Sequence, residues 1–244
     1  MKRLTHLLLI GAALGLPLTA AAAPYKEVTV SAGGSVSGKV TFSGTDPAPK
    51  IYKITKDNDT CGTGNRKIDY VKVNNGALTN VVVYLDKVKE GKPFPSNLGG
   101  TIDQKGCEFR PFLQVMRNGD ELAAINDDPV LHNIHTYEML GRAKKTVFNV
   151  SQAKTGTIKK KVNLKRGSAM KVECDAHDFM HGFVFVAKNP YFAVVGEDGS
   201  YTIDDIPPGK YTIKAWHGTL KEQKAKVEIT GGKTATVNFE FKGK

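Results

Sequence analysis

The chain has 244 residues, a formal net charge of +11, 40% apolar residues and 24% charged residues. This composition is typical of a soluble globular protein and excludes a disordered chain, and the length allows one large or two small domains. The 3 cysteines exclude a disulfide-dense small scaffold and a multi-cysteine zinc or iron–sulfur array.

The first 23 residues have the pattern of a secretory signal peptide. Lys2 and Arg3 form a charged start, residues 7–18 form an apolar run, and alanines follow up to Ala23. This order predicts cleavage after Ala22 or Ala23. The apolar run is too short to span a membrane comfortably, and no later segment reaches spanning length. We therefore expect a soluble protein that is periplasmic or secreted, without a transmembrane segment.

Alternation with a period of two residues dominates the rest of the chain. Val28 and Val30 flank a threonine near the start, and similar alternation returns at 201–203, 211–213 and 237–241. Such alternation of β-branched or aromatic residues with polar ones is typical of half-buried strands. Glycine-containing turns separate the strands at hairpin-like spacing. The sequence predicts an all-β fold, with two β-sandwiches.

The cysteines divide into a pair and a single thiol. In an oxidising compartment, an odd number of cysteines leaves one unpaired. Cys61 and Cys107 have no ligand-type residues beside them, and each stands next to a glycine. We expect a disulfide between these two, which leaves Cys174 as the free thiol. A thiol that survives export is best explained by a metal that holds it as the thiolate.

Most of the histidines stand in two short segments, residues 131–135 and 174–181. The second segment also contains a cysteine and a methionine, in the order Cys174, His177, Met180. Cysteine, histidine and methionine are the ligand types that favour copper. The sequence therefore predicts a copper site built from this loop and a histidine of the distant first segment.

The loop Cys174-x-x-His177-x-Phe179-Met180 resembles the copper loop of the cupredoxins and is closest in spacing to the amicyanin type. The pair His132-Asn133 resembles the first ligand of that family. Asn126, six residues earlier, and the apolar strand 184–186 also fit the family's pattern. The resemblance covers roughly residues 79 to 188.

This resemblance implies a Greek-key β-sandwich that holds one mononuclear type 1 copper ion. His132, Cys174 and His177 would be the strong trigonal ligands, and Met180 would be the weak axial ligand. His177 would be the partly exposed ligand through which electrons leave, with Phe179 and Phe183 as its apolar surroundings.

Three further histidines are left open as metal ligands. His135 and His181 are additional candidates, and His181 directly follows the expected axial methionine. His217 is expected to be structural or on the surface, and it becomes a candidate near the metal if the C-terminal segment folds back over the site.

The C-terminal segment, roughly residues 190–244, resembles the carboxypeptidase regulatory-like domain, a small β-sandwich. Residues 34–40 are similar to the opening strand of such a module, and whether the N-terminal strands belong to it is left open by the sequence. The predicted division is a signal peptide at 1–23, an N-terminal β extension at 24–78, a cupredoxin-like copper domain at 79–188 and a regulatory-like β-sandwich at 189–244.

Other metal centres and enzyme classes fit the sequence less well. Zinc gives no reason for Met180, and closed zinc sites usually contain more than one cysteine. A dinuclear copper centre needs two cysteines in the loop, a multicopper oxidase needs His-x-His pairs, and haem attachment needs Cys-x-x-Cys-His. No phosphate-binding glycine loop or Gly-x-Ser-x-Gly elbow is present. We therefore expect a protein that is not an enzyme.

The sequence leaves two functions open, and it gives less support to a third, a structural β protein whose metal is secondary. The favoured function is one-electron transfer between redox partners, and the alternative is copper binding for sequestration or delivery. Between Met139 and Val172 the chain has ten basic residues and no acidic one. Most of these are expected to form a solvated surface. They also suggest an acidic redox partner, such as a c-type cytochrome or a dehydrogenase, and nucleic acid is not expected.

Overall fold

The structure is a computed structural model, and it describes residues 25–141 and 143–243. The predicted signal peptide at 1–23 lies outside the described residues. Within the described part of the chain, no helix is both long enough and apolar enough to cross a membrane. The regular structure of the described residues consists of strands and one short helix, so the predicted all-β fold is confirmed.

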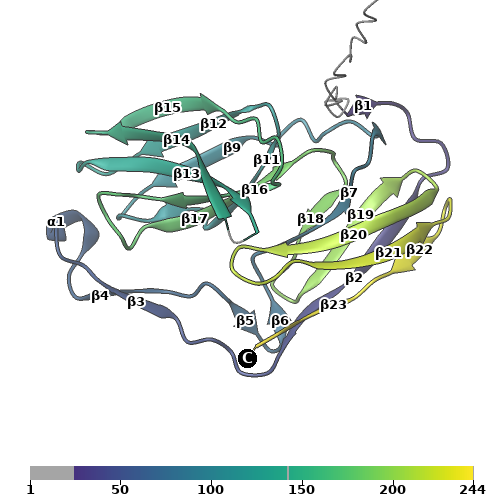
Figure 1. The fold of residues 1–244 in the computed structure, drawn as a ribbon, viewed down its shortest axis with the longest axis horizontal. Helices are drawn as coiled ribbons and strands as arrows, with labels where there is room; N and C mark the ends of the chain where they lie inside the picture. The colour runs from purple at the N-terminus through teal and green to yellow at the C-terminus, as the bar shows by residue number, and fades with distance from the viewer. Residues whose placement is uncertain (1–24, 142, 244) are drawn as a thin grey trace, which may run out of the picture.

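The first β-sandwich (Figure 1) contains the metal-ligand candidates, which lie on one of its strands and in one of its loops. Its outer sheet consists, in spatial order, of β10 (Phe109–Arg110), β9 (Gly100–Gln104), β12 (Glu121–Asn126) and β15 (Gly156–Lys161). Its inner sheet consists of β11 (Leu113–Arg117), β17 (His181–Ala187), β16 (Ala169–Glu173), β13 (His132–Leu140) and β14 (Ala143–Gln152). A core cluster that includes Ile134, Val172 and Phe179 fills the space between the two sheets.

Alternation along β12 explains how this sandwich buries one face of its outer sheet. Leu122, Ala124 and Asn126 are buried, whereas Glu121 is exposed. Because successive side chains point to opposite faces, every second residue of β12 enters the core. β17 differs, since nearly all its residues are buried. It therefore has a protein layer on both faces.

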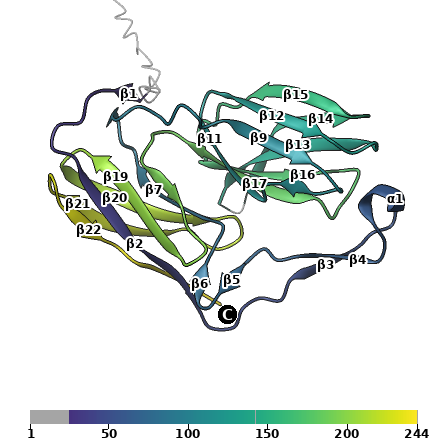
Figure 2. The same ribbon diagram turned by 180° about the vertical axis from the view of Figure 1, so that it is seen from behind.

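The second β-sandwich is built from both ends of the described chain (Figure 2). One sheet consists of β18 (Phe192–Val194), β7 (Val81–Asp86), β20 (Gly209–His217) and β21 (Gln223–Ile229). The other consists of β19 (Ser200–Ile206), β2 (Gly34–Ser43), β6 (Ala77–Leu78) and β5 (Val73–Asn74), with β22 (Thr234–Thr236) and β23 (Phe239–Lys242) paired to β2. A small parallel pair, β1 (Lys26–Glu27) with β8 (Glu90–Gly91), lies apart from both sheets.

The strand pairing crosses the predicted domain boundaries. β2, in the predicted N-terminal extension, pairs with β19, β22 and β23, which all follow residue 189. β7 begins at Val81 and pairs with β18 and β20, although the prediction assigned residue 79 onward to the copper domain. The continuous apolar run of β7 fits a strand buried on both faces, and it does not reveal which sheet will take it.

A third apolar cluster joins the two sandwiches. Phe183 and Phe185 of β17 face Trp216 of β20, with ring centroids 6.0 and 5.8 Å apart. Val82 and Tyr84 of β7 belong to the same cluster. The inner sheet of the first sandwich thus packs against the β7-containing sheet of the second.

A narrow arm, here defined as residues 50–68, extends from the second sandwich to one end of the first (Figures 1 and 2). It contains β3 (Lys50–Lys53), the helix α1 (Asn58–Cys61) and β4 (Asn65–Ile68), and β3 pairs with β4 as a hairpin. Ile54 and Cys61 of the arm lie in the core cluster of the first sandwich. The arm thus packs on the sandwich that contains the candidate ligands.

Candidate metal centre

The topology brings the two ligand segments together at one end of the first sandwich. His135 of β13 pairs with Glu173, the last residue of β16. Because the pairing is antiparallel, the residues before His135 lie beside those that follow Glu173. His132 therefore lies next to the loop 174–180, which connects β16 to β17.

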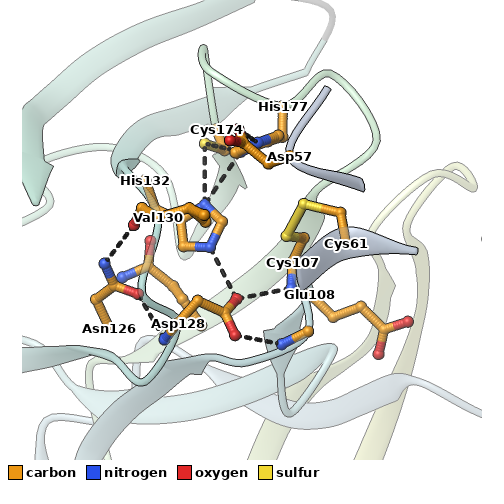
Figure 3. A network of polar contacts seen from close by, with 12 residues as sticks. Asp57, Cys61, Cys107, Glu108, Asn126, Asp128, Val130, His132, Cys174 and His177 are labelled. Carbon is orange, nitrogen blue, oxygen red and sulfur yellow. Dashed lines mark hydrogen bonds and ion pairs between the residues drawn. A yellow bond between two sulfur atoms is a disulfide. The ribbon is translucent and has the colours of Figure 1, made fainter. Parts of the chain in front are cut away.

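Three donor atoms converge there (Figure 3). His132 Nδ1 lies 3.1 Å from His177 Nδ1 and 4.0 Å from Cys174 Sγ, and His177 Nδ1 lies 3.8 Å from the same sulfur. All three residues are buried. Of the predicted ligands, these three form one cluster.

The triangle of donor atoms has the size that a single metal ion requires. From the three spacings, the point equidistant from the atoms lies about 2.1 Å from each, close to the ~2.0–2.1 Å of metal–nitrogen and ~2.3 Å of metal–sulfur bonds to zinc. His132, His177 and Cys174 would therefore hold a single ion at ordinary bond lengths. Two imidazoles and one thiolate in a trigonal arrangement suit copper.

A buried carboxylate orients His132. Asp128 Oδ2 accepts a hydrogen bond from His132 Nε2 at 2.9 Å, which leaves Nδ1 to face the cluster. The backbone N–H groups of Gly106 and Cys107 donate to the same carboxylate, each at 2.8 Å. Burial alone raises the pKa of Asp128, but the bonds from Cys107, His132 and Gly106 together lower it. Asp128 is therefore a stable anion behind the histidine.

A second carboxylate orients His177. Asp57 Oδ2, on the arm, accepts from His177 Nε2 at 2.8 Å. Burial lowers the pKa of His177, and the bond to Asp57 opposes that change. The side chain of His177 is 0% exposed. The expectation that His177 is partly exposed is therefore wrong, because the arm lies over the edge of the ring that the resemblance places in solvent.

Asn133 organises the loop around the free thiol. Its backbone N–H donates to Cys174 Sγ at 3.4 Å, and its Oδ1 accepts from the N–H groups of Asp175 and Ala176 at 2.6 and 3.2 Å. Burial raises the pKa of the Cys174 thiol, and the backbone N–H groups of Asn133, His177 and Ala176 oppose this. These donors favour the thiolate that a metal needs.

Met180 closes the ligand loop. Its N–H donates to the carbonyl of His177 at 3.0 Å, and its own carbonyl accepts from the N–H of Cys174 at 3.4 Å. The side chain is buried in the same core cluster as Cys174 and Phe179. Phe179 contacts His177, with ring centroids 5.4 Å apart. Phe183 belongs instead to the cluster between the sandwiches, because the alternation along β17 turns it to the opposite face.

The other candidate histidines have different partners. His135 Nδ1 lies 3.0 Å from both carboxylate oxygens of Asp175, outside the donor triangle. His181 Nε2 donates to the carbonyl of Asp178 at 2.7 Å. His217 is buried at the end of β20, and its Nδ1 accepts from the N–H of Thr219 at 3.2 Å. None of the three belongs to a cluster of donor atoms among the described residues.

Asn126 supports the turn before His132 without joining the donor set. Its Nδ2 donates to the carbonyls of Val130 and Gln152 at 3.0 and 3.3 Å, and its Oδ1 accepts from the N–H of Asp128 at 3.0 Å. It thereby fixes the turn that carries Asp128, the partner of His132.

The disulfide lies beside the donor triangle. Cys61 of α1 is bonded to Cys107, and Cys174 is a free, buried thiol. Sulfur atoms of Cys61 and Cys107 lie within 4.8 Å of each other and of a ring nitrogen of His177. The disulfide thus fastens the arm next to the candidate site.

Part of the basic segment between Met139 and Val172 lies away from the end of the first sandwich that carries the donor triangle. Lys159 and Lys161 of β15 pair opposite Ala123 and Glu121, whereas Gly156, at the metal end, pairs opposite Asn126. At about 3.3 Å per residue, Lys161 is about 16 Å along the strand from Gly156. The lysines of β15 are exposed but do not border the ligand loop.

Two residues of the site had no role in the sequence interpretation. Asp128 stands four residues before His132, and a carboxylate close to a candidate ligand is a usable signal, since metal-binding histidines commonly donate to one. Asp57 is 120 residues from His177, and nothing local marks it.

The fold and the donor set together define an all-β protein with a buried Cys-His-His cluster. A family model described as polysaccharide lyase family 4, domain II, matches residues 177–237. No curated protein matches the chain significantly.

Solved structures that overlap the chain include several cupredoxins. A purple cupredoxin from Nitrosopumilus maritimus is 18% identical, over 36% of this chain and 99% of its own, with a TM-score of 0.30. Amicyanin from Paracoccus versutus is 14% identical, over 43% and 97%, with a TM-score of 0.30. A copper-containing nitrite reductase from Thermus scotoductus is 16% identical, over 41% and 24%, with a TM-score of 0.28. The metal site itself is inferred from its side-chain geometry.

Proposed function

We propose that the protein is an exported carrier of single electrons that holds one mononuclear type 1 copper ion. The observation that carries the proposal is the convergence of His132 Nδ1, His177 Nδ1 and Cys174 Sγ at spacings that suit one ion. Copper bound by these residues would supply one-electron chemistry between its +2 and +1 states. Met180, buried beside Cys174, is the proposed axial ligand.

Hydrogen bonds around the site fix the orientation of the proposed metal ligands. His132 and His177 each have a carboxylate on Nε2, which fixes the ring orientation and the tautomer. Asn133 ties the start of β13 to the loop that carries Cys174. A donor set that moves little suits electron transfer, because both oxidation states of copper accept two imidazoles and a thiolate. No role as an enzyme is part of this proposal.

Burial of the site favours copper sequestration or delivery as a second candidate. His177 is fully buried and capped by Asp57, whereas a carrier benefits from an exposed ligand edge. The two functions differ in reversibility, since a carrier cycles its ion between two oxidation states and a storage protein holds or releases the ion itself.

Titration of the metal-free protein with copper(II) tests the proposal. We expect an intense visible thiolate-to-copper band that saturates at one equivalent, and a reversible one-electron wave in voltammetry. Cys174→Ser abolishes the band, because a hydroxyl oxygen is a harder and more basic donor. Met180→Leu keeps the band and raises the potential, because a weak donor to copper(II) is lost.

His135→Ala serves as the control, since His135 lies outside the donor triangle, and it should leave the band intact. A colourless copper complex would reject the electron carrier in favour of sequestration. If His181→Ala destroys the band while Met180→Leu changes neither spectrum nor potential, Met180 is not the axial ligand.

A further inference from the structure

We propose that the arm, residues 50–68, is the cover of the metal centre and that Asp57 is the residue through which it positions the ligand His177. This inference rests on the proposed copper site. It goes beyond that proposal by assigning a role to a segment that contributes no donor atom to the triangle. Removal of the metal by a small molecule would then depend on the arm.

The first observation is the contact itself. His177 directs Nδ1 at the donor triangle and Nε2 at Asp57 Oδ2, so both ring nitrogens are engaged. The ring is fully buried, while the side chain of Asp57 is 40% exposed. Asp57 thus stands between the ligand and the solvent. A carboxylate on the far nitrogen of a metal-bound imidazole fixes the ring and raises its basicity.

The second observation is the backbone at Asp57. Its φ of 51° lies in the left-handed region, which non-glycine residues adopt infrequently. The first turn of α1 holds this conformation, since the N–H groups of Thr60 and Cys61 donate to the Asp57 carbonyl at 3.0 and 2.8 Å. Residues kept in sparsely populated backbone conformations cluster at functional sites. Here the conformation presents the carboxylate to His177.

The third observation is the tether. The disulfide joins Cys61, four residues after Asp57, to Cys107. Arg66, on the returning strand of the arm, donates to the carbonyl of Cys61 at 3.0 Å. The same guanidinium donates to the carbonyls of Gly106 and Cys107, each at 3.1 Å. One covalent bond and several hydrogen bonds thus fix the arm to the loop around Cys107.

That loop also supports the other histidine ligand. The N–H groups of Gly106 and Cys107 donate to Asp128, which in turn accepts from His132. The loop at 106–107 therefore supports Asp128 behind His132 directly and Asp57 behind His177 through the arm. If the arm only stabilised its own hairpin, it would need neither a carboxylate at position 57 nor a hydrogen bond between that carboxylate and His177.

The experiment compares Asp57→Ala, Asp57→Asn and Asp59→Ala, each loaded with one equivalent of copper(II). Asp59 is an exposed acidic residue of α1, two residues after Asp57, and is the matched control. The rate of copper removal by an excess of a strong chelator is followed as loss of the thiolate-to-copper band. We expect removal about 10- to 100-fold faster for Asp57→Ala. Asp57→Asn, whose amide oxygen can still accept the bond, should be intermediate, and Asp59→Ala should match the wild type.

The reduction potential gives an independent readout. Loss of the anion next to His177 removes a stabiliser of copper(II), so Asp57→Ala should have a higher potential than Asp59→Ala. The double variant Cys61→Ser/Cys107→Ser should also release copper faster, because the arm loses its covalent tether. A thermal melt of each metal-free variant shows whether it is folded before its rate is interpreted.

A measurement without copper separates this inference from the proposed function. In the metal-free protein, the Nε2 proton of His177 should give a protected imidazole NMR resonance that disappears in Asp57→Ala and persists in Asp59→Ala. If the wild type binds no copper, the proposed function fails while this contact is still tested. If Asp57→Ala leaves both the resonance and the copper-removal rate as in Asp59→Ala, the arm is not a cover of the site.

Discussion

The two sandwiches use the same kind of strand but bury different side chains. The core of the second is formed by aliphatic and aromatic residues such as Leu85, Ile213 and Phe241. The first has an apolar core as well, yet one of its ends also buries His132, His177, Asp128 and other polar groups. Because both regions are built from strands, they differ in the polarity of what they bury.

This contrast indicates where function lies. Burying a polar group without a partner costs free energy, so a fold tolerates it only where each group is hydrogen-bonded. At the metal end, Asp128 has three donors, and Asn133 accepts from two backbone N–H groups. The second sandwich has no comparable network around a cluster of donor atoms in the described residues. We therefore regard it as the structural partner of the pair.

Truncation of the second core should separate stability from metal binding most strongly. Leu85 is fully buried in that core, so Leu85→Ala should reduce the free energy of unfolding by about 2–5 kcal/mol through lost burial and a cavity. The copper band of the folded protein should not change. Urea denaturation and absorption spectra check both expectations. Val194→Ala, at a residue 51% exposed on the adjacent strand β18, is the control. Loss of the band in folded Leu85→Ala would show that the second sandwich shapes the metal site.

Acid should destabilise the second sandwich through its buried histidine. Burial lowers the pKa of His217 to about 4, whereas an unfolded histidine titrates near ~6.5. The unfolded chain thus binds a proton between these values that the folded chain does not. Above about pH 6.5, His217 does not reduce the free energy of unfolding. As the pH falls from there towards 4, protonation of His217 in the unfolded chain reduces this free energy by about 3 kcal/mol in all.

Urea titrations of the metal-free protein at pH 7 and pH 4.5 measure this difference. In His217→Asn the side-chain oxygen can accept the bonds that Nδ1 accepts, and the loss of stability between the two pH values should be smaller. An unchanged difference between wild type and variant would assign the acid sensitivity to other groups, such as His177 and His181, whose pKa values burial also lowers.

The smallest effect is expected from the exposed lysines of β15. We propose that they steer an acidic redox partner, although their distance from the ligand loop limits their influence. β15 is also an edge strand, where lysines prevent edge-to-edge association. Reversing Lys159, Lys160 and Lys161 to glutamate should slow reduction of ferricyanide by the copper(I) protein severalfold at low salt, and the difference should vanish at high salt. Equal rates at low salt would leave the lysines with edge protection alone.

Some properties of the protein follow from short sequence intervals. The alternation of apolar and polar residues, with a period of two, indicated strands along the chain, because successive side chains of a strand point to opposite faces. The spacing Cys174-x-x-His177-x-x-Met180 brings three soft or borderline ligand types into one loop. The odd cysteine count separated Cys174 from the pair that the structure joins. Each of these inferences depends on neighbouring residues or on a count, so a single sequence was enough.

Other properties depend on contacts between distant residues, and only the tertiary structure decided them. The run Val81–Asp86 is apolar enough to join either sandwich. Its place is decided by its pairing with β18 and β20, which are distant in the sequence. Alternation along β17 directs Phe183 away from the donor triangle, and only the packing of the second sandwich gives it Trp216 as a neighbour. Asp57 reaches His177 across 120 residues. No local pattern encodes that contact, because it depends on where the disulfide and Arg66 fix the arm. The same contact buries His177, which the resemblance had placed partly in solvent.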